Sequence, residues 1–210
     1  MTDRPADTTH DETTGTVAAS DADDPADVSA IADRYDRLAA DFAATVDAVP
    51  DDRWSAPSPC EEWTARDVVA HVVETHAMFE GMVGRDVGDA PAAGDDPVAA
   101  FAAARAAVSG HLHDPDAASA TYDSPMLGTT TFARMIDRFI SADLVVHRWD
   151  LGTAAGLDVR LPADEVVRIH EGLAGMGDAM RGPGAFGPAV EPPDDADDQD
   201  RLLAFLGRRA

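Results

Sequence analysis

The chain has 210 residues, enough for one domain with a substantial core, and it carries 16 basic residues, all of them arginine, against 40 acidic ones. Its net charge of −24 repels phosphate backbones, so the composition argues against nucleic-acid binding. A single cysteine, Cys60, excludes an intramolecular disulfide framework, and no apolar run reaches the ~18 residues that a membrane span requires.

The N-terminal residues 1–27 contain no leucine, isoleucine or aromatic side chain and are dominated by Asp, Thr and Ala. Such a segment cannot bury enough apolar surface to offset the entropy lost on ordering, so we predict a disordered acidic tail. A solvating extension is its simplest role, and a partner-binding tail is the alternative. The segment also lacks the basic and apolar regions of a secretory signal, so we expect a cytoplasmic protein. The rest of the chain, 28–210, is predicted to form one domain.

Two amphipathic helices are predicted in the first part of this domain. Apolar residues recur at spacings of three and four from Val28 to Val49, and Pro50 ends the pattern. After a loop, Thr64 fits an N-cap, and Asp67 stands three residues later, as in a capping box. The helix that begins there presents one largely apolar face, which comprises Val68, Val72, Thr75, Phe79 and Met82.

A linker rich in Gly, Pro and Asp at 84–97 separates the second helix from the third. Asp96 and Pro97 fit the N-cap and first position of a helix. The apolar stripe of this third helix is Val98, Phe101, Val108 and Leu112. Residues 114–128 are rich in turn-forming types and should form a loop with room for a short hairpin.

Three more helices follow in the C-terminal part. The fourth runs from Phe132 to about Ala155, before Gly156, and the fifth spans about 163–180. A short terminal helix, Asp200–Leu206, ends at Gly207 in the manner of a C-cap. Four main helices with one or two accessory C-terminal helices indicate an all-α fold of the four-helix-bundle type.

The apolar stripe of the fourth helix is interrupted by two polar residues. Phe132, Ile136 and Phe139 lie on the same face as Asp143 and His147. A carboxylate buried at such a position is costly unless it is paired or bound to a metal. Residues four apart on a helix lie about 5–6 Å apart at Cβ, so both side chains can reach one ion.

The second helix carries a similar polar residue, His71, near its inward face beside Val68 and Val72. Since a bundle brings inward faces together, His71 with Asp143 and His147 would supply two nitrogen ligands and one oxygen ligand. Such a set suits zinc, nickel, iron or manganese and leaves positions open for water or substrate. A surface Asp/His pair, or a hydrogen-bonded pair in the core, is the alternative.

Two segments resemble the mycothiol-dependent maleylpyruvate isomerase N-terminal domain family, which belongs to the DinB-like metal-binding bundles. Residues 59–73, PCEEWTARDVVAHVV, are similar to the second-helix motif of that family. Residues 143–156, DLVVHRWDLGTAAG, are similar to its other metal motif. Residues 186–190 and 200–208 resemble the C-terminus of one subgroup, so the resemblance covers about residues 28–208.

The resemblance implies a DinB-like four-helix bundle in which His71, Asp143 and His147 hold a divalent metal. Zinc is the favoured ion, with nickel, iron or manganese as alternatives. The isomerase has glutamate as its acidic ligand, whereas this chain has Asp143, which is one methylene shorter. This difference bears on metal preference and on the geometry of the site.

Several other residues have two readings in the sequence. Cys60 could be a reactive thiol or a fourth ligand, or it could pack as a small apolar residue. Asp150 could orient a ligating histidine or lie exposed near a helix end. Glu74 could be a base near the site or a solvated carboxylate. His111 and His113 point to different sides of a helix, and we expect both at the surface.

Three functions follow from these observations. The first is a metal-dependent isomerase or transferase that uses a low-molecular-weight thiol and acts on small electrophilic molecules. The second is a non-catalytic metal-binding or interaction module, and the third is a structural bundle with a buried Asp/His network. A small molecule or thiol is the expected partner, and a homodimer is the default assembly. The acidic, lysine-free composition is typical of proteins from extreme halophiles.

Overall fold

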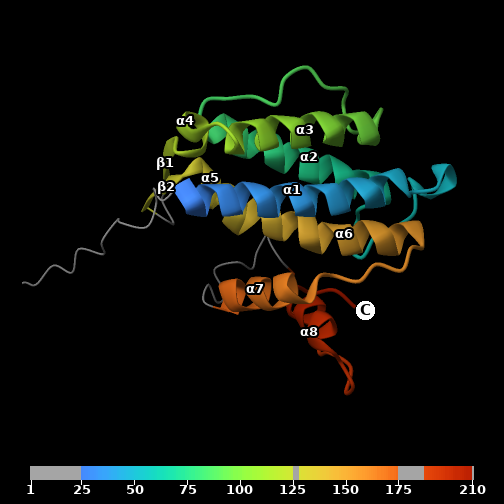
Figure 1. Ribbon diagram of the computed structural model, residues 1–210. Coiled ribbons are helices and arrows are strands. Elements are labelled where there is room, and N and C mark those ends of the chain that lie inside the picture. Colours follow the sequence, from blue (N-terminus) through green and yellow to red (C-terminus); the bar gives the residue numbers. More distant parts are fainter. Residues whose placement is uncertain (1–24, 125–127, 175–186, 210) are drawn as a thin grey trace, which may run out of the picture.

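The protein is described by a computed structural model, which covers residues 25–124, 128–174 and 187–209. Four long helices form a bundle (Figure 1), and α1 and α2 each pack against both α3 and α6. The order around the core is therefore α1, α3, α2, α6, and the predicted all-α four-helix bundle is confirmed. These helices are α1 (Pro25–Asp47), α2 (Ala65–Met82), α3 (Pro97–Leu112) and α6 (Ser141–Ala155).

Shorter elements close one end of the bundle (Figure 1). A single turn, α4, is followed by an antiparallel hairpin in which Thr121 pairs with Thr131, as the sequence had room for. The chain then enters one long helical segment made of α5, a π-helical stretch η2 and α6. The bounds are η1 (a 3₁₀ turn, Asp51–Arg53), α4 (Pro115–Ala118), β1 (Thr121–Ser124), β2 (Gly128–Thr131), α5 (Phe132–Met135) and η2 (Ile136–Ile140).

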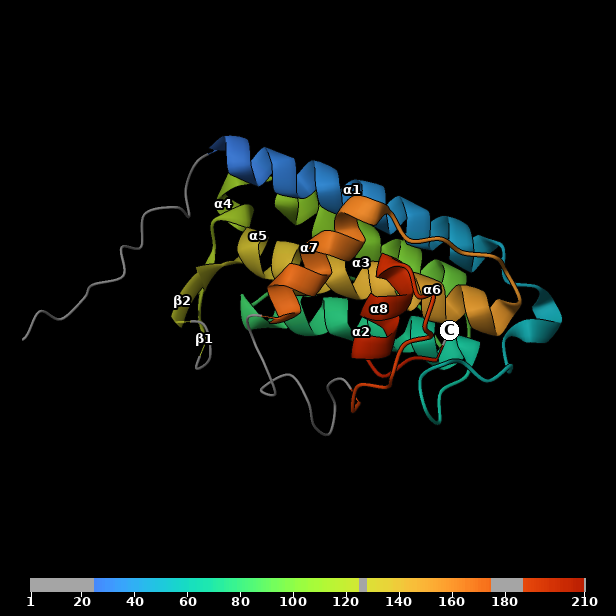
Figure 2. The ribbon, with the colours of Figure 1, turned by 90° about the horizontal axis from the view of Figure 1, so that it is seen from below.

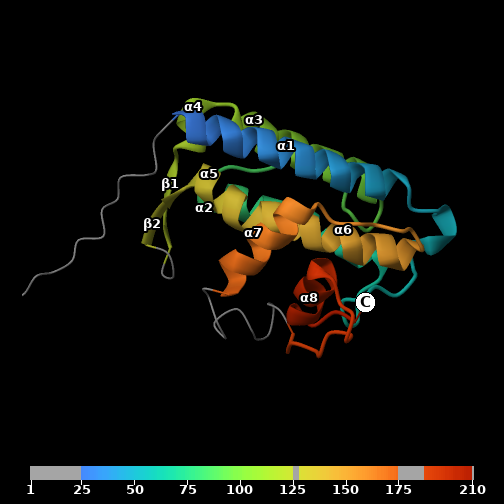
Figure 3. The same cartoon turned by 60° about the horizontal axis from the view of Figure 1, so that its bottom comes forward.

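A smaller C-terminal layer consists of α7 (Ala163–Ala174) and α8 (Asp198–Phe205). The two helices pack on each other, and α7 also contacts α6 on the side of the bundle away from α3 (Figures 1 and 3). They are the expected accessory helices. The fifth helix is predicted to extend to about residue 180, and the last six residues of that prediction lie outside the described part of the chain. In that part, no helix is long and apolar enough to cross a membrane.

The helix starts were predicted best where a side chain caps the backbone. The Thr64 hydroxyl accepts from the Asp67 N–H, and the Asp67 carboxylate accepts from the Thr64 N–H, so both halves of the capping box are present. Asp96 accepts from the Ala99 N–H and Pro97 follows it, as expected for α3.

Other boundaries differ from the prediction. Helix α1 begins at Pro25 rather than Val28, so three residues of the predicted disordered tail are helical, and residues 1–24 lie outside the described part. Helix α8 begins at Asp198, because Asp197 rather than a later residue caps it. Val98 is 42% exposed, so its place in the apolar stripe of α3 was wrong, since it lies in the first turn of that helix.

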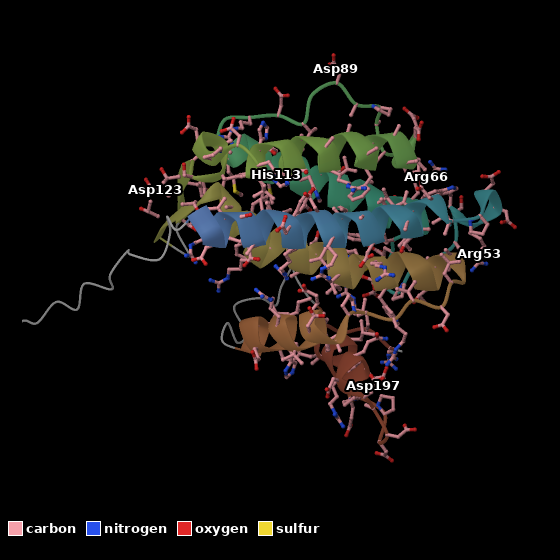
Figure 4. The ribbon with its side chains drawn as sticks, in the orientation of Figure 1. Arg53, Arg66, Asp89, His113, Asp123 and Asp197 are labelled. Carbon is pink, nitrogen blue, oxygen red and sulfur yellow. The ribbon has the colours of Figure 1, made fainter. Side chains whose placement is uncertain are left out.

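The fourth predicted helix contains a feature that has no counterpart in the prediction. Residues Ile136–Ile140 form a π-helical turn, in which the Ser141 N–H donates to the Ile136 carbonyl five residues back. The helix then returns to α geometry and ends at Gly156, whose φ of 76° is the left-handed conformation that favours glycine. Arg53, labelled in Figure 4, donates to the Ala154 carbonyl at 2.8 Å and so places a cation at the C-terminal end of α6.

A buried histidine, His76, makes stability depend on pH. Its Nδ1–H donates to the Val72 carbonyl at 2.7 Å, and Nε2 accepts from the Tyr35 hydroxyl at 3.1 Å, so the neutral ring is fully satisfied. Burial lowers its pKa from 6.5 to about 4. The stabilisation from neutral His76 is therefore fully present above pH 6.5 and is lost as the pH falls toward 4.

We expect the stability advantage of the wild type over His76→Gln to shrink by about 1 kcal/mol between about pH 7.5 and about pH 5.5. Urea denaturation of both proteins at the two pH values measures this difference. The exposed His113 provides the control, since His113→Gln should not remove this dependence. An advantage that stays constant with pH would contradict this prediction, because it would show that folding does not change the pKa of His76.

Candidate metal centre

The structure brings together the three residues that the sequence singled out. His71 lies on α2, and Asp143 and His147 lie one turn apart on α6. His147 Nε2 is 3.2 Å from Asp143 Oδ1, and His71 Nε2 is 3.5 Å from Asp143 Oδ2. One ligand atom from each of the three side chains lies within 4.8 Å of the other two. The prediction that these side chains converge is therefore confirmed.

One oxygen of this cluster has an unsatisfied bonding capacity. Asp143 Oδ2 is buried and has no hydrogen-bond partner among the residues described. A buried carboxylate oxygen without a partner is costly, and a bound ion is one of the few arrangements that explain such an atom. The donor set of two imidazole nitrogens and one carboxylate fits a divalent transition metal such as zinc.

The electrostatics of the cluster also favour a cation. Burial opposes charge on both Asp143 and His147, but their mutual attraction outweighs it. The pKa of Asp143 is therefore held below its usual range, and the nearby His71 imidazole lowers it further. The pKa of His147 is raised well above 6.5 by Asp143, and Asp150 and Cys60 assist. Positive charge beside the Asp143 carboxylate is therefore favoured at this site.

A buried carboxylate, Asp150, holds the side of the His147 ring that faces away from Asp143. Asp150 is fully buried, and its Oδ2 accepts from His147 Nδ1 at 3.0 Å. Of the two readings of Asp150, orientation of a histidine is the one that the structure supports. Burial raises the pKa of Asp150, but His147 and Arg208 lower it to about 2, so it is a carboxylate at neutral pH.

Arg208, which was not predicted from the sequence as part of the site, contacts both Cys60 and Asp150. Cys60, His147 and Asp150 form another group with metal-ligand spacing. The Arg208 guanidinium already lies there, with Nη2 2.9 Å from Asp150 Oδ2 and 3.3 Å from Cys60 Sγ. An arginine in that position supplies the positive charge, so the group that contains His71 is the better site for an ion.

Trp63 covers the two histidines. Its ring centroid lies 4.7 Å from that of His71 and 5.8 Å from that of His147. The Thr75 hydroxyl lies 3.4 Å from His71 Nε2. The His71 side chain is 33% exposed while that of His147 is 7% exposed, so solvent reaches the cluster from the His71 side.

Two histidines and one glutamate lie away from this site. Glu74 is exposed, which supports the solvated reading. His113 is exposed as expected and pairs with Asp36 at 2.8 Å. His111 lies only partly at the surface: its side chain is 31% exposed, and its Nδ1 lies 2.8 Å from the fully buried carboxylate of Glu80.

The fold and the site define a DinB-like helical bundle with a candidate metal centre between α2 and α6. Residues 35–152 match the family described as the mycothiol maleylpyruvate isomerase N-terminal domain, and the chain belongs to this family. All three residues of the cluster lie within the matched segment, whereas Arg208 lies beyond it.

Two relatives come from Mycobacterium tuberculosis: uncharacterized protein MT0763 of strain CDC 1551 / Oshkosh and uncharacterized protein Rv0738 of strain ATCC 25618 / H37Rv. Each is 34% identical to this chain over 169 residues, which cover 80% of this chain and 91% of the relative. No solved structure matches the chain.

Proposed function

We propose that this protein binds one divalent metal ion, with zinc favoured, through His71, Asp143 and His147. The observation that carries the proposal is the buried Asp143 Oδ2, which has no hydrogen-bond partner in the described structure although two imidazoles flank the carboxylate. Family membership supports it independently, since the matched segment contains all three residues.

We further propose that the bound ion serves chemistry with a low-molecular-weight thiol. A divalent metal supplies a Lewis acid that favours the thiolate form of a thiol near neutral pH. The thiolate would add to the double bond of a small electrophilic molecule, and a proton would complete the adduct. Loss of the same thiol and proton after bond rotation gives isomerisation, whereas retention of the thiol gives a transferase.

A non-catalytic metal-binding module is the second candidate. It is favoured by the absence of a free base beside the cluster in the described residues. Glu74 faces solvent, and Asp150 is engaged by both His147 and Arg208. Thiol-transfer assays on the metal-loaded protein with electrophilic alkenes distinguish the two candidate functions. Only an enzyme produces turnover that depends on the bound ion.

The metal site is tested by elemental analysis of protein purified in high salt without a polyhistidine tag. We expect about one ion per chain in the wild type and a large loss of metal in His147→Ala, because His147 supplies one of three ligands. His113→Ala is the matched control, since this exposed histidine lies outside the cluster and should leave the metal content unchanged. The proposal would be refuted if the wild-type protein contained no metal as purified and bound none when metal was added.

A further inference from the structure

Arg208, in the C-terminal segment, contacts Asp150, which is the carboxylate that accepts a hydrogen bond from His147. Arg208 follows α8, and only 9% of its side chain is exposed, although arginine is rarely buried without a specific partner. Figures 2 and 3 show this end of the chain beside the turns that precede α2, where Cys60 lies. Arg208 therefore joins two segments that are 148 residues apart in sequence.

The contacts of Arg208 fix the orientation of Asp150. Nη2 lies 2.9 Å from Asp150 Oδ2 and Nε lies 3.3 Å from Oδ1, so the guanidinium holds both carboxylate oxygens. The Nη1 group donates to the Leu206 carbonyl at 2.9 Å, which fixes the guanidinium relative to its own segment. Asp150 in turn accepts from His147 Nδ1, which leaves Nε2 facing Asp143.

We infer that Arg208 is a positioning residue for the metal centre, acting through Asp150 on the ring of His147. Partners behind a ligating histidine set its tautomer and orientation, and their loss commonly reduces metal affinity about 10–100-fold. The inference rests on the proposed metal function. It adds that a residue beyond the segment matched by the family completes the site from the C-terminal end.

Charge and positioning predict effects of opposite sign. Arg208 is a cation close to a site for cations, so by Coulomb's law alone its removal would tighten metal binding. If Arg208 acts by holding Asp150 and His147 in place, its removal weakens binding instead. The direction of the change therefore separates the two effects without reference to any enzymatic activity.

The test measures Zn²⁺ affinity by competition with a chromophoric chelator in wild type, Arg208→Met and Arg209→Met. Arg209 is the adjacent, exposed arginine, so its variant controls for net charge. We expect a loss of about tenfold in Arg208→Met and no loss in Arg209→Met. The visible spectrum of the Co²⁺-loaded protein should change in Arg208→Met alone, because the spectrum reports the geometry of the ligands.

A double variant keeps the test valid if Arg208→Met does not fold well, because Asp150→Asn/Arg208→Met removes both charges of the buried pair. If Arg208 acts through Asp150, the double variant binds Zn²⁺ no more weakly than Asp150→Asn does. Unchanged or tighter binding in Arg208→Met, or additive losses in the double variant, would overturn this inference alone. A wild type that binds no Zn²⁺ would overturn the proposed function and this inference together.

Discussion

In the Asp143→Asn variant, Zn²⁺ should no longer stabilise the protein against unfolding. An ion that binds only the folded chain adds about 4 kcal/mol at a free concentration 1,000 times its dissociation constant. Asparagine has nearly the volume of aspartate but lacks the negative charge that a divalent ion requires between the two imidazoles. Thermal unfolding of the wild type should therefore shift upward with Zn²⁺, and that of the variant should not.

The control for this experiment is Asp47→Asn, which removes one exposed carboxylate at the end of α1 and leaves the site intact. It should respond to Zn²⁺ as the wild type does, and the response should be reversed by EDTA. If Zn²⁺ stabilised Asp143→Asn as strongly as the wild type, the ion would bind elsewhere on this acidic surface.

The Arg34→Met variant should lose about 3 kcal/mol of unfolding free energy. Arg34 on α1 donates to Glu165 on α7 at 2.9 Å and to Asp137 in the π-helical turn at 2.6 Å. The side chains of Arg34 and Glu165 are only 9% and 2% exposed. Burial raises the pKa of Glu165, but Arg34 and Arg37 lower it overall, so the variant keeps a buried carboxylate that has lost its main partner.

Arg37 limits this loss, because its Nη2 remains 2.8 Å from Glu165 Oε1. Urea denaturation at about pH 7 measures the effect. Arg160→Met breaks an ion pair with Asp197 whose two side chains are 64% and 44% exposed, so it should cost far less than Arg34→Met does. Equal losses in the two variants would show that burial of the Arg34 network does not determine its contribution.

Local signals in the sequence were sufficient for the main helices, whereas the three residues of the cluster were identified only with the help of the family resemblance. The capping box at Thr64 and the Asp96-Pro97 pair depend on residues within four positions, so the chain itself encodes those helix starts. The polar residues Asp143 and His147 stood out because the rest of their stripe is apolar. His71 was identified more weakly, and the family resemblance joined it to the other two.

The groups that the sequence did not reveal depend on contacts between distant segments. Arg208 meets Asp150 across 58 positions, and no periodicity links them. His111 meets Glu80 across 31 positions, so this pairing depends on how α2 and α3 pack together. The short turn α4 and the π-helical turn were also missed, because neither has a composition that distinguishes it from a loop or from α-helix.

The π-helical turn determines how the side-chain faces before and after it, in α5 and in α6, are rotated relative to each other about the helix axis. Each residue of an α-helix advances the chain by about 100° around the axis, so one extra residue within a turn rotates everything before it relative to everything after it. Asp137, in this turn, faces Arg34 on α1, whereas Asp143 faces His71 on α2. Deletion of one residue within Ile136–Ile140 would restore a regular helix and turn one of these faces away from its neighbour. The extra residue in the π-helical turn thus lets one continuous helical segment present side chains to two different sides of the bundle. A change of a single residue in the length of this turn would disrupt that arrangement.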